Sequence, residues 1–449
     1  MKKYEMKYKK KGMKTDKGRF RKAAVILFWV ALWAGLCLTV DNSVLMASPL
    51  KTAEKLAEFL KTGEFYHAVG LSLLRIGAGF LAGFTAAVIL AAGSSRFFLL
   101  EELLSPVMGA AKSVPVASFA VVVLIWWGSD VLAVAVCFLV VLPNLYISTI
   151  EGFRSSDRKL LEMAQVFRLP AESRFLYIYR PALKPFLYSG MKVSLGMCWK
   201  SGVAAELIGI PMHSIGEQIY LSKLYLDTAG VFAWTAVVMS LAFLFEKLIL
   251  CLTEQFFSWE PSIRKQRTCP RDGGERRLVA RAVAKSVDIT VKSGEVVWLT
   301  WPSGSGKTTL LHILAGLLEP EEGTCETPEG CSMVFQEDRL CEDYSGSKNV
   351  ELITGDLRRA KEALAFLGLN EDEILRPCSS LSGGMRRRVA LARAMEADSA
   401  CVFLDEPFTG MDEDTARLAG RYIRERQNGR ILVIASHDSP PEIPCDISL

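Results

Sequence analysis

The chain has 449 residues, of which 50% are hydrophobic, and its mean hydropathy is +0.24. This length predicts two or three domains, and the apolar excess argues against a wholly soluble protein. The formal net charge is only +4, but lysine and arginine dominate residues 1–22. A basic tail could bind nucleic acid or acidic lipid. Because an apolar run follows at once, we interpret it as a cytoplasmic tail that sets topology, in contact with membrane lipid and with no nucleic acid partner.

The apolar run from Ala23 to Val40 could be the core of a secretory signal. It is long for that role, and Ala47-Ser48-Pro49 is a poor cleavage site because of its proline, so we favour an uncleaved first helix. The 11 cysteines are scattered, without a C-x-x-C pair or a nearby histidine. This spacing predicts free thiols in membrane helices and a reducing cytosol, rather than disulfides or a metal site.

Apolar segments of membrane-spanning length recur through the first half of the chain. We place six spans in a transmembrane domain of residues 23–258, near residues 23–46, 67–93, 103–127, 131–152, 184–205 and 229–252. An even number of spans returns the chain to the cytoplasm, which agrees with the basic N-terminus and with the charged stretch after Trp259.

Two ionisable residues, Lys200 and Glu206, belong to the fifth apolar segment. Charge inside a bilayer is costly and is often tied to a transport pathway. Lys200 could instead snorkel, or the two residues could lie near a helix end or pair with each other. We favour these structural explanations over a direct role in binding substrate.

A charged stretch, residues 155–184, separates the fourth and fifth spans; we call it the docking segment. It keeps apolar residues at helical spacing, namely Leu160, Leu161, Ala164 and Phe167, and Pro170 then breaks the pattern before a second short amphipathic piece. An ordinary cytoplasmic loop is one explanation. Two short amphipathic helices with a break between them favour a docking element for a cytoplasmic partner.

The docking segment contains two stretches with a recognisable pattern, Leu161-Glu162-Met163-Ala164-Gln165-Val166-Phe167-Arg168 and Tyr179-Arg180-Pro181-Ala182-Leu183-Lys184-Pro185. Together they resemble the EAA coupling loop of ABC importer permeases. Residues 72–75, 112–128 and 204–209 are similar to permeases of the nitrate/sulfonate/taurine/bicarbonate branch, so the resemblance covers about residues 65–258. It implies that Glu162, Ala164 and Arg168 belong to the coupling contact. The chain departs from the family at Arg168, where a glycine is usual, and at Met163, an alanine-type position.

After the membrane half, residues 259–282 are polar and basic, and we interpret them as a linker. In residues 283–449 strand-like runs alternate with helical ones, as in a P-loop α/β domain. Its centre is Ser303-Gly304-Ser305-Gly306-Lys307-Thr308-Thr309, which lies between an apolar strand-like run and a helical pattern. A chance turn rich in glycine and serine is the alternative, and this context on both sides argues against it.

The chemistry expected of this loop is phosphate binding. Its glycines let the backbone approach phosphate oxygens, and its amides and the following helix N-terminus would cradle an anion. Lys307 would reach the β- and γ-phosphates, and the Thr308 hydroxyl would ligate Mg²⁺. The pattern G-x-x-x-x-G-K-[ST] expects its first glycine at position 301, where this chain has Trp301. Tryptophan lacks the backbone freedom that a glycine turn can require.

Further motifs follow the P-loop in chain order. They are Gln336 beyond a short strand-like run, Leu381-Ser382-Gly383-Gly384 before a helical pattern, Asp405-Glu406 at the end of an apolar strand, Asp412 after Gly410, and His437 after a last strand. Each motif alone is weak evidence for a nucleotide site, because an acidic pair usually marks a solvated strand end and a lone histidine is usually structural. In this order around one P-loop, coincidence is negligible.

Together these motifs resemble the ATP-binding subunit of ABC transporters over about residues 283–449, which implies ATP and Mg²⁺ as cofactors. The resemblance implies that Asp405 holds Mg²⁺ through water, with Thr308 and Gln336 completing the metal site. Glu406 would polarise the attacking water, while Gln336 and His437 would sense and contact the γ-phosphate. Such positioning with charge stabilisation is what phosphoryl transfer requires.

The same resemblance implies partners. Ser382, Gly383, Gly384 and Asp412 would bind the nucleotide held by another ATPase domain, so a homodimer would be the minimal transporter. An extracytoplasmic solute-binding protein would deliver the solute. We therefore expect an α-helical transmembrane domain of about six spans, followed by an α/β P-loop NTPase domain of ABC type. It would be a multi-pass protein of the cell membrane, with the ATPase domain in the cytoplasm, that imports a small anionic or polar organic solute.

Two other functions stay open on the sequence alone. No aromatic residue occurs between Glu260 and Val297, where the family usually places a ring that stacks on adenine. With Trp301, this motivates a nucleotide-binding membrane protein that hydrolyses ATP weakly or not at all. An ABC exporter is the other alternative, since fusion of the two halves is commoner there, but the coupling-loop match argues against it.

Overall fold

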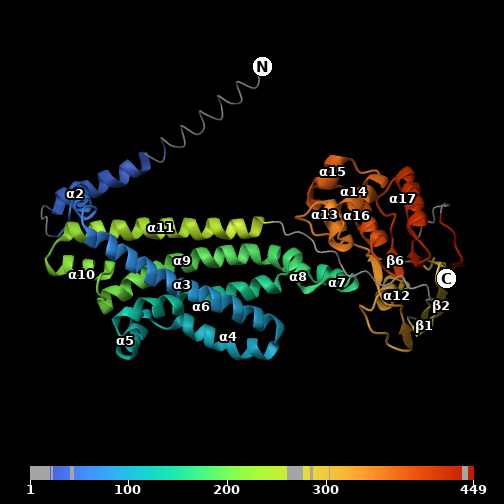
Figure 1. Ribbon diagram of the computed structural model, residues 1–449, viewed down its shortest axis with the longest axis horizontal. Coiled ribbons are helices and arrows are strands. Elements are labelled where there is room, and N and C mark those ends of the chain that lie inside the picture. Colours follow the sequence, from blue (N-terminus) through green and yellow to red (C-terminus); the bar gives the residue numbers. More distant parts are fainter. Residues whose placement is uncertain are drawn as a thin grey trace, which may run out of the picture. The chain divides into compact units, whose positions relative to one another are not determined.

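The computed structural model describes residues 21, 24–40, 45–259, 277–283, 287–302, 304–436 and 443–448 (Figure 1). The chain divides into two compact units. The first comprises Met1–Arg154 and Pro185–Phe256, and the second comprises Ser155–Lys184 and Phe257–Leu449. The docking segment therefore folds with the nucleotide half of the chain, although the sequence places it between two membrane helices.

The first unit is helical throughout its described part. Its elements are an apolar helix, Ala24–Val40, then α2 (Pro49–Phe59), α3 (Gly63–Arg96), α4 (Phe98–Ser113), α5 (Val116–Trp127), α6 (Ser129–Arg154), α9 (Arg180–Gly209, whose first turn belongs to the second unit), α10 (Ile215–Leu224) and α11 (Thr228–Ser258). Each of the six predicted spans falls on one of these helices or, for the third, on a pair of them. The helical membrane-type domain is confirmed.

Three described helices, α3, α6 and α11, are long and apolar enough to cross a membrane, and the pair α4 and α5 raises the number to four if it is one span. That pair is bent by 101°, because the chain is extended at Val114 and Pro115. Proline lacks the N–H that a helix needs and disfavours helical backbone at the residue before it. The predicted continuous span 103–127 is thus broken. The count of six requires two further crossings, by Ala24–Val40, which is short, and by α9, which carries Lys200 and Glu206.

Small residues let α3 and α6 lie side by side in this unit (Figure 1). A Cβ atom at Gly79 would lie 2.6 Å from the carbonyl oxygen of Val134, so only glycine allows this approach. Glu206 is completely buried in α9, where it accepts a 2.7 Å hydrogen bond from the Ser72 hydroxyl of α3 and one from the Gly216 amide of α10. These contacts support a structural role for Glu206, which ties three helices together.

Two sheets form the second unit. A parallel sheet has the strand order β5-β6-β7-β3-β8, from β3 (Val296–Leu299), β5 (Cys331–Val334), β6 (Cys401–Asp405), β7 (Ile431–Ala435) and β8 (Ile447–Ser448). An antiparallel sheet has the order β2-β1-β4, from β1 (Arg277–Val283), β2 (Val287–Lys292) and β4 (Thr324–Glu326). Every residue of β3, β6 and β7 is buried, as expected of parallel strands covered on both faces.

The start of this unit differs from the sequence expectation. Strand β1 begins at Arg277, inside the stretch interpreted as linker, and pairs with β2 and β4. Its two arginines, Arg277 and Arg281, are exposed, whereas Leu278 and Ala280 are buried. The basic composition of this stretch therefore concealed a strand with one solvated face.

The helices of the second unit include those of the docking segment. They are α7 (Arg158–Val166), α8 (Ala171–Arg174), the π-helix η1 (Phe175–Tyr179), α12 (Lys307–Leu314), α13 (Gly346–Thr354), α14 (Leu357–Phe366), α15 (Glu371–Leu375), the 3₁₀-helix η2 (Cys378–Ser380), α16 (Gly383–Glu396) and α17 (Glu413–Arg426). Buried apolar residues of the docking segment, among them Met163, Ala164 and Phe167, belong to the same hydrophobic core as the strands of the sheet.

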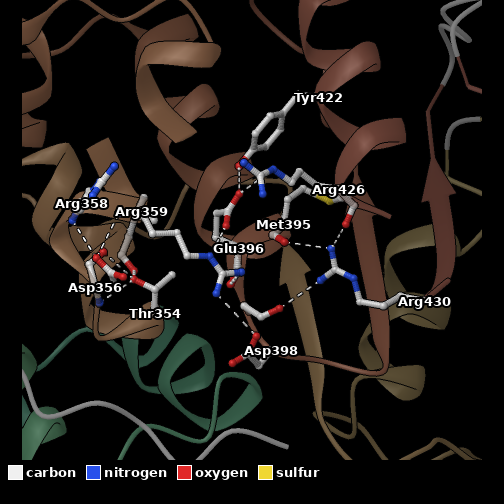
Figure 2. A network of polar contacts seen from close by, with 12 residues as sticks. Thr354, Asp356, Arg358, Arg359, Met395, Glu396, Asp398, Tyr422, Arg426 and Arg430 are labelled. Atoms are coloured by element: carbon white, nitrogen blue, oxygen red, sulfur yellow. Dashed lines mark hydrogen bonds and ion pairs between the residues drawn. The ribbon is translucent and has the colours of Figure 1, made fainter. Parts of the chain in front are cut away.

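A buried carboxylate joins three of these helices (Figure 2). Glu396, at the end of α16, is completely buried and accepts hydrogen bonds from the Tyr422 hydroxyl of α17 at 2.7 Å and from Nε of Arg359 in α14. Arg426 of α17 lies 3.3 Å from the same carboxylate. A buried charge is tolerated only when paired in this way, so the network fixes the end of α16 relative to α14 and α17.

Candidate active site

The loop between β3 and α12 turns at two glycines. Gly304 and Gly306 have φ angles of 79° and 101°, a left-handed conformation that glycine adopts without strain. A Cβ atom at either position would meet no described atom within 4 Å, so the backbone conformation, and not lack of space, favours glycine there. Trp301 is not among the described residues with positive φ, and its half-buried side chain packs against the hydrophobic core. The backbone at position 301 therefore does not require the conformational freedom of a glycine.

Buried polar groups converge around this loop. Lys307 is 8% exposed, and its ammonium nitrogen lies 3.9 Å from Oε1 of Glu406. The Thr308 hydroxyl donates a 2.8 Å hydrogen bond to Oδ2 of Asp405. The Ser305 hydroxyl is buried and has no hydrogen-bond partner among the residues that the structure describes. A buried cation and an unsatisfied hydroxyl suit a phosphate, and a hydroxyl beside a carboxylate supplies the oxygen ligands that Mg²⁺ prefers. The residues present thus fit ATP with Mg²⁺.

The two acidic residues at the end of β6 have different surroundings. Asp405 is buried, and this burial raises the pKa of its carboxyl above the ordinary value although Thr308 donates to it. Glu406 is half-buried and has a φ angle of 47°, unusual for a residue other than glycine. Its amide donates to the carbonyl of Ala435 at 2.7 Å, and Ser436 lies 3.4 Å from its carboxylate. The structure thus brings together Lys307, Thr308, Asp405 and Glu406.

Gln336 is exposed two residues after the end of β5, and residues that follow it contact the docking segment. Nζ of Lys159 lies 2.6 Å from Oε1 of Glu337. Nη1 of Arg339 lies 2.6 Å from Oε2 of Glu162, and the Arg339 guanidinium stacks 3.9 Å from the ring centre of Phe335. A cavity of about 450 Å³ lies beside these ion pairs, between the docking segment and residues 337–344. Two ion pairs therefore connect the predicted coupling loop to the segment that begins at Gln336.

The structure also shows how the docking segment accommodates its two departures from the family pattern. Arg168 has a φ angle of 50°, and after it the amide of Leu169 donates to the carbonyl of Ala164, which closes α7. The turn therefore has the left-handed geometry that suits a glycine, with arginine in its place. Met163 is completely buried in the core, where its flexible side chain fills space.

The remaining predicted site residues lie elsewhere or outside the described residues. Ser382 and Gly383 are exposed at the start of α16, and Asp412 is exposed at the start of α17, where it caps the helix. A Cβ atom at Gly384 would lie 2.6 Å from the Gly410 carbonyl, which explains the need for glycine there. Ser303 and His437 fall outside the described residues.

Sequence reasoning missed the residues that connect these motifs. Arg387 is buried in α16 and donates hydrogen bonds to the carbonyls of Asp405 and Glu406, and Arg339 and Lys159 join the docking segment to the stretch after Gln336. The run Arg386-Arg387-Arg388 is visible in the sequence, but nothing in it distinguishes the buried arginine from its partly exposed neighbours.

Comparison with known proteins agrees with this geometry. Residues 284–409 match the ABC transporter family model, and residues 79–252 match that of the binding-protein-dependent transport system inner membrane component. The aliphatic sulfonates import ATP-binding protein SsuB 1 of Rhodococcus jostii (strain RHA1) is 43% identical over 166 residues, which are 35% of this chain and 67% of that protein.

Two further relatives have the same printed function. SsuB 2 of Paraburkholderia xenovorans (strain LB400) is 45% identical over 145 residues, 31% of this chain and 58% of its own length. SsuB 3 of Nocardia farcinica (strain IFM 10152) is 39% identical over 171 residues, 37% of this chain and 69% of its own length. The chain thus spans only part of the length of these relatives.

The chain belongs to the ABC transporter family, and it joins a transport permease domain and an ABC ATP-binding domain in one polypeptide. It is a membrane protein and belongs to the class of ATP hydrolases that are coupled to transport.

Proposed function

We propose that this chain is half of an ABC importer in which two copies together move a small anionic solute across the cell membrane. The proposal rests on one observation: two ion pairs join the docking segment to residues 337–339, which follow Gln336 directly. They place a permease-derived helix against the ATPase domain of the same chain, so a change at the nucleotide would reach the permease through α7. The ATPase domain would face the cytoplasm.

The residues have separable roles in this proposal. The loop from Ser303 to Thr309 would hold the phosphates, with Lys307 neutralising their charge. Thr308, Asp405 and Gln336 would hold Mg²⁺, which when bound would neutralise charge on the β- and γ-phosphates. Glu406 would accept a hydrogen bond from the attacking water and hold it in line with the γ-phosphate, and His437 would orient the same water.

A second copy of the chain would complete each site. Ser382, Gly383, Gly384 and Asp412 begin helices, and Ser382, Gly383 and Asp412 are exposed there, so they are accessible to a nucleotide held by another ATPase domain. A symmetric dimer would supply two such composite sites and two permease domains. An extracytoplasmic solute-binding protein would deliver the solute, as the permease family description implies.

The relatives support a sulfonate as the solute, since three of them are named for aliphatic sulfonate import. We infer an alkanesulfonate or a taurine-like compound. The test is uptake of labelled ethanesulfonate by proteoliposomes that hold the protein, ATP and a candidate binding protein. ATP-dependent uptake is expected; intact ATP hydrolysis without uptake of any sulfonate would overturn the choice of solute and leave the ATPase assignment standing.

Hydrolysis itself is tested on the protein reconstituted in nanodiscs, as the parent, Glu406→Gln and Lys307→Ala. Both variants should lose hydrolysis by about 10²-fold or more. Lys348→Ala is the matched control, because Lys348 pairs with Glu351 on α13 and has no role in the proposed site. Parental activity in Glu406→Gln would refute the proposed base. A parent that binds ATP but does not hydrolyse it, even with solute and binding protein, would favour the nucleotide-responsive alternative.

A further inference from the structure

One buried arginine donates hydrogen bonds to three backbone carbonyls in two of the predicted motifs. Arg387, in α16, is 3% exposed. Its guanidinium donates to the carbonyl of Phe335 at 2.6 Å, to that of Asp405 at 2.5 Å and to that of Glu406 at 2.7 Å. Nη1 also donates to Oδ1 of Asp338 at 3.1 Å, and Nε donates to the Glu406 carbonyl at 3.1 Å. All its nitrogens therefore serve as donors.

The three carbonyls that accept these hydrogen bonds lie beside predicted catalytic residues. The Phe335 carbonyl belongs to the peptide bond that leads into Gln336, and the other two carbonyls flank the proposed base. Arg387 also lies one helical turn after Gly384, on the helix that begins with the signature residues. A single side chain thus holds the signature helix, the start of the glutamine segment and the end of β6 in one arrangement.

The backbone at Glu406 needs such support. A left-handed conformation costs a residue with a Cβ atom about 1–2 kcal/mol, so it persists only where its surroundings enforce it. At Glu406 the amide donates to the Ala435 carbonyl, and the Glu406 carbonyl accepts both Nε and Nη2 of Arg387. The two contacts fix the peptide groups on either side of the residue. Because the backbone conformation sets the direction of the Cα–Cβ bond, they also set where the carboxylate lies.

We propose that Arg387 is a positioning residue for ATP hydrolysis: it holds the backbone of Glu406 in the left-handed conformation that aims its carboxylate at the γ-phosphate. This rests on the proposed role of Glu406. Without the guanidinium, residue 406 relaxes toward an ordinary backbone conformation and its carboxylate moves away from the water. Lys307 and residues 304–309 keep their places, so nucleotide binding persists.

The test uses the full-length protein in nanodiscs, with Arg387→Gln and Arg387→Lys. Arg387→Gln keeps one donor group, and kcat should fall by about 10²-fold, as misplacement of a reacting group by an ångström does, while the KM for ATP changes less than about threefold. Arg387→Lys, whose ammonium can still reach one or two of the carbonyls, should recover part of this loss. Titration with a fluorescent ATP analogue gives the number of nucleotide-binding sites per chain. Dividing the hydrolysis rate by this number gives a kcat that misfolded protein does not lower.

Arg430→Gln is the matched control. Arg430 also donates to backbone carbonyls, those of Met395, Ala397 and Arg426, but at the far end of α16 (Figure 2). It should lower the midpoint of thermal unfolding and leave kcat per nucleotide site near the parental value. If Arg387→Gln does not fold, Arg387→Lys carries the test alone, since a fall in kcat at constant KM supports the proposal.

Two results would overturn the proposal. One is a parental kcat per nucleotide site in both Arg387 variants. The other is a loss of ATP hydrolysis per chain that an equal loss of nucleotide-binding sites accounts for in full, which shows that Arg387 only stabilises the fold. Failure of the underlying assignment is distinguishable: if Glu406→Gln hydrolyses ATP at the parental rate, Glu406 is not the base, whatever the Arg387 variants do.

Discussion

The ion pair between Glu162 and Arg339 should govern how firmly α7 is held on the ATPase domain. The perturbation is Glu162→Gln and Arg339→Gln, alone and together. Arg339 has a side chain only 9% exposed, whereas that of Glu162 is 43% exposed. Hydrogen bonds to charged groups contribute about 1.5–3 kcal/mol, and the exposure of Glu162 reduces this through solvent screening. We therefore expect a coupling free energy of about 1–2 kcal/mol between the two side chains.

Amide hydrogen exchange of peptides covering Arg158–Val166 reports this free energy directly, because α7 must leave the domain to exchange. Loss of about 1–2 kcal/mol corresponds to about 5–30-fold faster exchange in α7. Arg339→Gln should have the larger effect, since it also loses the contact with the Phe335 ring. Exchange in α17, Glu413–Arg426, is the internal control and should not change.

The double variant decides the question. If the ion pair holds α7, exchange in the double variant is slower than the product of the two single effects predicts, because the first change has already removed the ion pair. Strictly multiplicative effects would refute the reasoning. Unchanged exchange in both single variants would show that the buried apolar contacts of Met163 and Phe167 alone hold the helix.

Three further predictions concern the same unit. Arg168→Gly should raise the midpoint of thermal unfolding, because the left-handed turn costs arginine about 1–2 kcal/mol and glycine loses only about 0.5–1 kcal/mol of chain entropy in exchange; Arg168→Ala keeps the strain, so an equal rise there would contradict this account. Tyr422→Phe removes a donor from the buried Glu396 carboxylate and should cost about 1–3 kcal/mol, measured as a lower unfolding midpoint in urea; an unchanged midpoint would show that the hydroxyl contributes nothing. Burial, together with the charge of Arg339, lowers the pKa of His312 below its ordinary 6.5. As pH falls through 6.5 the unfolded chain therefore binds the proton first, and the folded state loses stability. Unfolding midpoints measured from pH 8 to 5 should depend less on pH in His312→Gln than in the parent, and an identical dependence would argue against this account.

Some expectations held because they depend on local chemistry. At positions 304 and 306 the backbone has the positive φ that only glycine adopts freely, which agrees with a glycine-shaped loop, while phosphate binding there stays a prediction. The helix at 158–166 followed from apolar residues at helical spacing. Strand β1 was missed, because a strand with one exposed face of arginines has the composition of a linker. The effect of Trp301 on ATP use stays a prediction, although its backbone has no left-handed conformation that would need a glycine.

By itself the sequence determined the class of each half: apolar runs long enough for helices in a membrane, and an ordered set of motifs around one P-loop. Both follow from residue type and short-range spacing. The tertiary structure alone decided that Ser155–Lys184 folds with the ATPase domain, and that one arginine of three, Arg387, holds the carbonyls of Phe335, Asp405 and Glu406. These contacts join residues far apart in the chain, and whether an arginine is buried depends on what packs over its helix, which no local pattern records.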